Sequence, residues 1–142
     1  MLRGRFESAG ELSPADLRSR YDDLLAETIE AVGPDRVAEQ SGVDEGTIAA
    51  LAAGESPALT LDEAAAILAT DEGLPDADSI AAEARDILLM GMSIAVLDVE
   101  AVAAGLDDEL EPKEIHGKVE GRYPMTLDEY AMVHRYIEHE KR

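Results

Sequence analysis

Hydrophobic positions along the first half of the chain follow a helical period. From Ser13-Pro14 to Gly33, apolar residues recur three or four positions apart, which places them on one face of a helix. A hydroxyl residue followed by Pro is a typical helix start, and Gly is a typical stop. Similar start and stop residues predict three more helices. They lie between Pro34 and Gly42, between Asp44 and Gly54, and after the capping-box residues Thr60 and Glu63.

The second half shows the same order of patterns. Gly73 and Pro75 mark a connector, and Asp78 or Ser79 is then placed to cap a long helix. Its segment 87–97 is apolar on nearly all faces, so we expect this helix to be central and buried. Three more helices are predicted: one from Asp98 to Gly105, one from Pro112 to near Gly121, and one after Thr126. No alternating stretch predicts a strand, so the expected fold class is all-α, with about eight helices.

One stretch of sequence occurs twice. Thr60-Leu61-Asp62-Glu63 reappears as Thr126-Leu127-Asp128-Glu129, and an Ala-x-x-x-Gly segment lies upstream of each copy. Repetition at a fixed spacing is typical of duplicated supersecondary units. We therefore predict tandem duplicated, helix-turn-helix-like four-helix modules packed together. The predicted organisation is a flexible tail (1–12), a first module (13–70), a connector (71–78) and a second, divergent module (79–142).

The first module carries the residues of a known motif. Ala38, Gly42 and Ile48, with apolar neighbours between 37 and 51, resemble the pattern of phage-repressor-type helix-turn-helix domains. The resemblance implies that Gly42 adopts the left-handed conformation in the turn. A base-reading second helix would offer Arg, Lys, Asn or Gln side chains to the groove of DNA. Here that helix begins with Asp44 and Glu45, so we expect this module to be a packing unit.

Composition narrows the class of protein. The chain has 32 acidic and 12 basic residues, a formal net charge of −20, and a hydrophobic content of 46% that is too high for a disordered acidic tail. An acidic surface with few Lys residues is typical of proteins that remain hydrated in high salt. Segments 85–92 and 121–130 resemble an uncharacterised family of small acidic haloarchaeal proteins. That resemblance implies a salt-loving source and assigns no activity.

The charge is distributed unevenly. Residues 1–111 contain 26 acidic and 6 basic side chains, whereas residues 112–142 contain 6 of each. Cationic and aromatic side chains of the kinds that contact phosphates or bases gather in this last segment. They could equally pair with carboxylates of the first module or meet a protein partner. The candidate partner- or nucleic-acid-binding residues are Lys113, His116, Lys118, Arg122 and Tyr123.

Several functions are not expected. There is no Cys, and no Ser has a nearby His at a spacing that would activate it. His134 and Glu138 share a helix face, but two ligands do not make a zinc site, so we expect no metal and no cofactor. No signal peptide or membrane-length apolar run is present, which favours a cytoplasmic protein without membrane contact.

The sequence therefore predicts a non-enzymatic regulatory or adaptor protein that makes protein contacts through its C-terminal module. The alternative is a DNA-binding transcriptional regulator that uses the candidate cations. A third possibility, a homodimer formed through the apolar segment 87–97, also follows from the pattern.

Overall fold

The chain folds as an all-helical molecule in the computed structural model, which describes residue 6 and residues 8–141. Within these residues there are eight α-helices, one short 3-10 helix (η1) and no strand longer than an isolated bridge. The elements are η1 (Ala9–Glu11), α1 (Pro14–Val32), α2 (Pro34–Ser41), α3 (Glu45–Ala52), α4 (Leu61–Leu68), α5 (Ala77–Ala95), α6 (Val99–Gly105), α7 (Pro112–Val119) and α8 (Leu127–Glu140).

Capping side chains fix where most helices begin. The Thr60 hydroxyl accepts a 3.1 Å hydrogen bond from the Glu63 amide, and the Glu63 carboxylate accepts one of 3.0 Å from the Thr60 amide. The same reciprocal pair forms between Thr126 and Glu129 at the start of α8. Both capping boxes were predicted from the sequence. The start of α5 differs from the prediction, because its cap is Asp76, which accepts a bond from the Ser79 amide at 2.8 Å.

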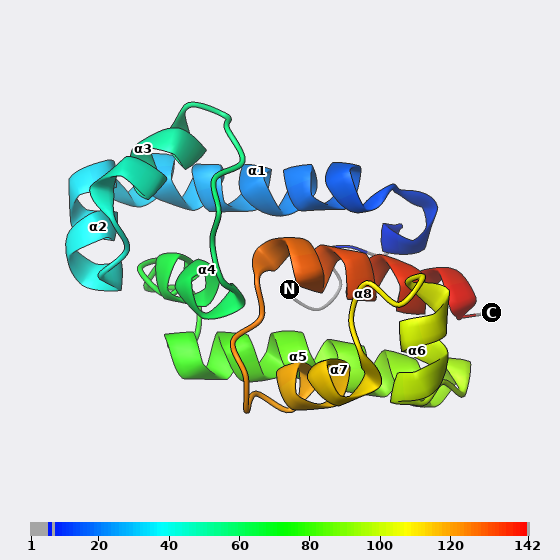
Figure 1. Cartoon of the computed structure of the whole chain (residues 1–142). Helices are drawn as coiled ribbons and strands as arrows, with labels where there is room; N and C mark the ends of the chain where they lie inside the picture. The colour runs from blue at the N-terminus through cyan, green and yellow to red at the C-terminus, as the bar shows by residue number, and fades with distance from the viewer. Residues whose placement is uncertain (1–5, 7, 142) are drawn as a thin grey trace.

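The helices are arranged in layers (Figure 1). The long helices α1 and α5 form the two outer sides, and α4 and α8 lie between them. Helix α8 packs on both α1 and α5, and α4 does the same from the first half of the chain. The short pairs α2–α3 and α6–α7 cover the flanks, which is compatible with a bundle of two helical modules.

The two copies of the repeated sequence meet each other at the centre. Thr60 and Thr126 form an isolated antiparallel bridge. In it, the Leu61 amide donates to the Met125 carbonyl and the Leu127 amide donates to the Leu59 carbonyl, both at 2.8 Å. The two copies of the repeated segment therefore pair directly with each other.

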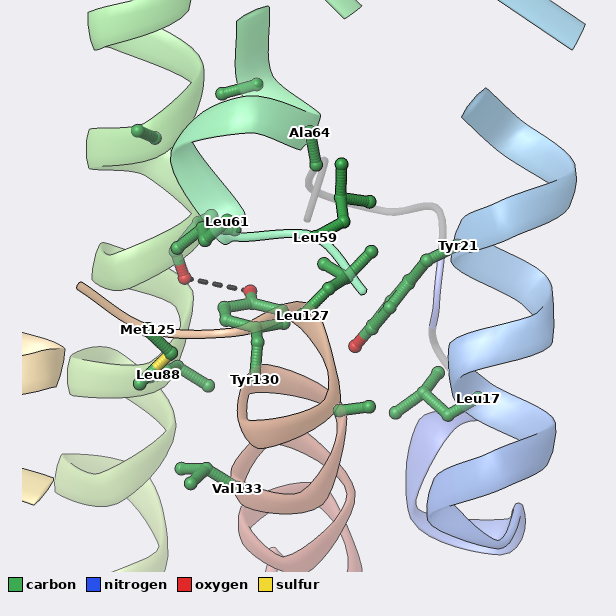
Figure 2. Packing of buried hydrophobic residues seen from close by; sticks show 14 of the residues in the cluster. Leu17, Tyr21, Leu59, Leu61, Ala64, Leu88, Met125, Leu127, Tyr130 and Val133 are labelled. Carbon is green, nitrogen blue, oxygen red and sulfur yellow. Dashed lines mark hydrogen bonds between the residues drawn. The ribbon is translucent and has the colours of Figure 1, made fainter. Parts of the chain in front are cut away.

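The hydrophobic core lies around this bridge (Figure 2). Tyr21 from α1 and Tyr130 from α8 are fully buried, with ring centroids 5.7 Å apart. The Tyr130 hydroxyl donates a 2.8 Å hydrogen bond to the Ala84 carbonyl of α5 and so ties α8 to that helix. Small and branched side chains such as Leu61 and Ala64 fill the remaining space, with no water-exposed atoms. One continuous core therefore holds both halves together.

The prediction that α5 is the central, buried helix is wrong. Its outer side exposes large apolar residues, and Ile94 and Val96 are 59% and 88% exposed. The central helix is α8, which contacts α1, α4, α5, α6 and η1. Apolar residues on all faces favour burial. In this fold, however, the position between α1 and α5 is taken by helices of both modules.

Part of the predicted flexible tail is packed against the body of the protein. Residues 1–5 and 7 lie outside the described residues. Ala9 is fully buried, and a Cβ added to Gly10 would lie 2.6 Å from the His139 backbone nitrogen of α8. The ring of Phe6 meets that of Tyr21 edge-on, 4.8 Å away. The segment from residue 8 to residue 12 is therefore part of the fold, where the sequence predicted a loose tail.

Candidate interaction surfaces

The residues predicted to bind a partner lie on α7 and in the loop that follows it. Pro112 begins α7, and its cap, Glu111, forms a capping box with Glu114. The buried side of the helix carries Ile115 and Val119. Because the cations fall between these apolar positions, the helix presents them sideways or outward.

Most of these cations are paired with the protein's own carboxylates. Lys118 binds Glu129 of α8 and lies 3.9 Å from Glu114. The Glu120 carboxylate lies 3.1 Å from Nε2 of the His116 imidazole and 3.2 Å from the Arg122 guanidinium. Lys113 is exposed, and the structure shows no ion pair for it within the described residues. The candidates thus lie on α7 and in the loop after it, where His116, Lys118 and Arg122 each meet one of the protein's own carboxylates.

The Lys118–Glu129 ion pair holds α7 against α8. Burial acts to raise the pKa of the Glu129 carboxyl, but hydrogen bonds from Lys118 and from the Thr126 cap lower it below its ordinary value. The same carboxylate therefore caps α8 and anchors α7. Tyr123 covers the backbone of α7, since a Cβ at Gly117 would lie 2.3 Å from its ring. Its remaining surface, 46%, faces solvent.

The turn between α2 and α3 has the geometry that the sequence predicted. Gly42 is left-handed, with φ of 73°, and Ile48 and Leu51 are buried. The first residues of α3 are Asp44, which caps the helix, and Glu45, and both are exposed. A helix that offers carboxylates at this position repels phosphate.

A buried arginine that was not predicted from the sequence joins α1 to two other segments, α8 and the α3–α4 loop. Arg18 is 4% exposed. Its guanidinium donates to Asp22 at 2.9 Å, to Asp128 at 2.8 Å and to the Pro57 carbonyl. The second oxygen of Asp22 accepts a hydrogen bond from Ser56. Every charge in this network is therefore met by a partner, as a buried ion pair requires.

A groove opens beside this network. We call it the first groove; it encloses about 670 Å³ between α1, the end of α3, the α3–α4 loop and α8. Leu51, Ala26 and Met132 supply apolar lining, and Asp23 and Glu109 are exposed carboxylates on its rim. This volume is in the range of sites that hold a small ligand or a few side chains of a partner. The lining makes it an acidic groove with an apolar floor.

A related groove lies at the corresponding place in the other half. Arg85 of α5 reaches across to Asp62 of α4 at 3.3 Å, as Arg18 of α1 reaches across to Asp128 of α8. Arg85 also donates to the Lys118 carbonyl at 3.2 Å. This second groove encloses about 520 Å³ and is lined by α4, α5 and the end of α7. Each half thus contributes one Arg that pairs with an Asp of the other half.

A sequence signal for this exchange was present. Asp62 and Asp128 are members of the repeated Thr-Leu-Asp-Glu segment, and each half carries an Arg in its first long helix. The repeat shows that the aspartates are equivalent. It does not show that each one meets the arginine of the other half, because that depends on how the modules pack.

A second buried polar group lies under α1. The Tyr21 hydroxyl shares a short hydrogen bond with Nδ1 of His134, and Nε2 of His134 lies 3.7 Å from Glu138. Burial raises the pKa of Tyr21, so its hydroxyl is the donor and the imidazole nitrogen the acceptor. Burial likewise lowers the pKa of His134, although Glu138 opposes the shift. The pair is neutral and enclosed, which suits a core contact.

The described part of the chain contains neither a cluster of metal ligands nor a single membrane-length apolar helix. No group of three or more His, Cys, Asp or Glu residues is placed to hold a metal ion. No single helix among residue 6 and residues 8–141 is long and apolar enough to cross a membrane. Helices α5 and α6 meet the length and hydropathy criteria only as a pair, with a 92° bend between them.

Comparison with known proteins identifies the family. A model described as "Family of unknown function (DUF5791)" matches residues 17–140, which includes all eight α-helices except the first turn of α1. The chain belongs to this family. No curated protein and no solved structure matches it significantly. The family therefore agrees with the resemblance to an uncharacterised family and assigns no activity.

Proposed function

We propose that this member of the DUF5791 family is a non-enzymatic regulatory or adaptor protein that binds a basic, amphipathic segment of a protein partner in the first groove. The observation that supports this is the groove itself, with its apolar floor between α1 and α8 and exposed carboxylates on its rim. Asp128, Glu129 and Met132 of the C-terminal module form one wall. The C-terminal module thus contributes to the contact, but through α8 and not through the α7 cations.

Charge and shape both support a basic segment. Five carboxylates line the first groove, and Arg18 is the one cation among its lining residues. Asp22 and Asp128 are already bound by Arg18, so Asp23 and Glu109 are the rim groups left to meet an incoming Lys or Arg. The stem of such a side chain can lie on apolar surface while its charged end stays at the rim. Ala26 and Met132, which are both partly exposed, offer that surface.

The alternative, a DNA-binding regulator, receives less support from the contacts. Affinity for DNA comes largely from neutralising phosphates with free cations. His116, Lys118 and Arg122 each have a carboxylate partner within the molecule, which leaves Lys113 as the one candidate residue with an ammonium group that no described carboxylate meets. A chain of net charge −20 also repels the phosphate backbone as a whole.

Quantitative capture from lysate at native salt tests the adaptor proposal. Wild type is compared with Asp23→Lys, which reverses a rim charge, and with Glu30→Lys, which makes the same change at an exposed position of α1 outside the groove. We expect a partner that is retained by wild type and Glu30→Lys and lost with Asp23→Lys. Equal capture by all three proteins would rule out the groove.

Binding to genomic DNA fragments tests the alternative. The measurement is made at the lowest salt at which the protein stays folded, where phosphate attraction is strongest. We expect no binding by wild type. Binding that is abolished by Lys113→Ala would instead support the DNA-binding regulator.

A further inference from the structure

The outer side of α5 carries large apolar side chains that are partly or mostly exposed to solvent. Leu89, Met90, Ile94 and Val96 are 41%, 46%, 59% and 88% exposed, and we call these four residues the apolar α5 face. Exposed apolar side chains scattered singly are ordinary, but a group on one side of a single helix end marks an interaction site. The exposed Ser93 lies among them.

The corresponding side of α1 has the opposite character. Counting from the equivalent arginines Arg18 and Arg85, the positions of Leu89, Met90 and Ile94 correspond to Asp22, Asp23 and Glu27. Asp22 is buried against Arg18, but Asp23 and Glu27 are exposed, as are Met90 and Ile94. At these two exposed positions one half presents carboxylates and the other presents hydrocarbon. Packing within the monomer therefore does not require apolar residues here.

Backbone conformation points to the same end of α5. Val96 is left-handed, with φ of 57°, and Leu97 closes the helix by donating to the Met92 carbonyl at 2.8 Å. This position normally holds Gly or Asn, because a β-branched side chain is strained there. Val96 is strained and 88% exposed, so its side chain makes no packing contribution to the stability of the monomer that would offset the strain. A contact that buries its side chain would account for it.

Charge indicates which partner fits. Residues 87–97 form the longest stretch of the chain without a charged residue. Two copies of a protein with net charge −20 repel each other as whole molecules. An uncharged, apolar helix end is the surface on which like-charged copies can meet with least repulsion. The exposed carboxylates Asp86 and Asp98 lie only at the two ends of this stretch, so a basic partner would find nothing to bind at its middle.

We infer that the apolar α5 face is a homodimer interface. In a two-fold arrangement the same patch serves both copies, so antiparallel α5 helices would place Leu89 and Met90 of one copy against Ile94 and Val96 of the other. Ser93 would then lie near the two-fold axis, where a small side chain lets the helices approach closely. This inference is independent of the first groove, which lies between α1 and α8.

The mass in solution tests the inference, measured by light scattering or sedimentation equilibrium over a range of protein and KCl concentrations. We expect wild type to reach twice the 15.2 kDa of the chain, and the dimer fraction to rise with salt as repulsion is screened. Ile94→Glu should weaken the dimer at least about tenfold, since interface centres do not tolerate unpaired charge. The matched control is Ala52→Glu, at an exposed position of α3, which should leave the dimer dissociation constant unchanged.

Cross-linking gives a second, local readout. The chain has no Cys, so Ser93→Cys introduces a single thiol at the proposed axis. We expect mild oxidation to give a covalent dimer with Ser93→Cys and none with Ala52→Cys. A monomeric wild type at every concentration, a dimer that persists in Ile94→Glu, or one that weakens with salt would each overturn the inference. Asp23→Lys should keep the dimer, so a failure here is distinct from a failure of the groove proposal.

Discussion

The guanidinium of Arg18 is the single group on which most buried charge depends. Removing it leaves Asp22, whose side chain is 8% exposed, without its cation. Breaking a buried ion pair by removing one partner costs about 3–5 kcal/mol, because a charge is left uncompensated. We therefore expect Arg18→Met to lower the free energy of unfolding by that amount, as measured by chemical denaturation at constant salt.

Arg85 provides the matched control. It makes the equivalent contact from the other half, but its partner Asp62 has a side chain that is 61% exposed. Exposed pairs contribute about 0–1 kcal/mol, so Arg85→Met should cost much less. The double change Arg18→Met with Asp22→Leu should recover part of the loss, because no buried charge remains. Equal costs for the two arginines would contradict this account of the network.

His134 should make stability depend on pH. Its folded-state pKa lies below the ordinary value of 6.5 because the ring is buried. A group with a depressed folded-state pKa binds its proton more readily when unfolded, so its contribution is present above about pH 6.5 and is lost as pH falls below it. The slope can approach about 1.4 kcal/mol per pH unit for one proton. Urea denaturation between about pH 7 and 5, above the range where carboxylates titrate, measures it.

Removing the imidazole isolates this effect. His134→Asn keeps an acceptor near the Tyr21 hydroxyl and should flatten the pH dependence between about pH 7 and 5. An unchanged slope in His134→Asn would show that another group is responsible.

At the scale of elements, the C-terminus of α5 is expected to be less stable than it could be. Val96 occupies a left-handed position that costs an L-residue about 1–2 kcal/mol, whereas Gly adopts it freely. Val96→Gly should therefore raise the free energy of unfolding by about 1 kcal/mol, even though it removes a side chain. Thermal and chemical unfolding at a protein concentration that keeps the chain monomeric would measure the gain.

The reverse substitution serves as the control. Gly42 ends α2 with φ of 73°, and a Cβ added there would meet nothing within 4 Å. Gly42→Ala should thus lose about 1 kcal/mol from backbone strain alone. If both substitutions were neutral, left-handed strain would not limit the stability of this fold.

Local sequence rules were sufficient to predict where the helices begin and end. They were insufficient to predict which helices and side chains contact each other. Caps and stops such as Thr60, Thr126 and Gly42 act within a few residues, so the predicted helices appear with small shifts at their ends. The burial of α5 could not be predicted, because many apolar faces compete for one central position. Lys118 was identified as a candidate residue from the sequence, but its partner Glu129 was not, because the two lie eleven positions apart. For Arg18 the separation from Asp128 is 110 positions.

At the scale of the whole molecule, net charge should control stability. With 32 acidic and 12 basic residues, the folded chain concentrates like charges that repel at low ionic strength. Salt screens this repulsion over a distance of about 3 Å at 1 M. We expect helical circular dichroism to be lost on dialysis into dilute buffer and restored in molar KCl. Full helical signal in dilute buffer would contradict this expectation.

The packing of the two halves leads to a prediction about their independence. The second-half helix α8 packs on α1, and the first-half helix α4 packs on α5, so each half completes its core with a helix from the other. A protease site inserted at exposed Gly73, between α4 and α5, should therefore be cleavable without separating the halves.

After cleavage at this connector, we expect the two fragments to co-elute in size-exclusion chromatography and to keep the helical signal of the intact chain. Each fragment produced alone should lack a cooperative unfolding transition, because its part of the shared core is incomplete. Uncleaved protein with the same insertion controls for the insertion itself. Fragments that separate in native buffer and unfold cooperatively by themselves would show instead that the two halves are independent domains.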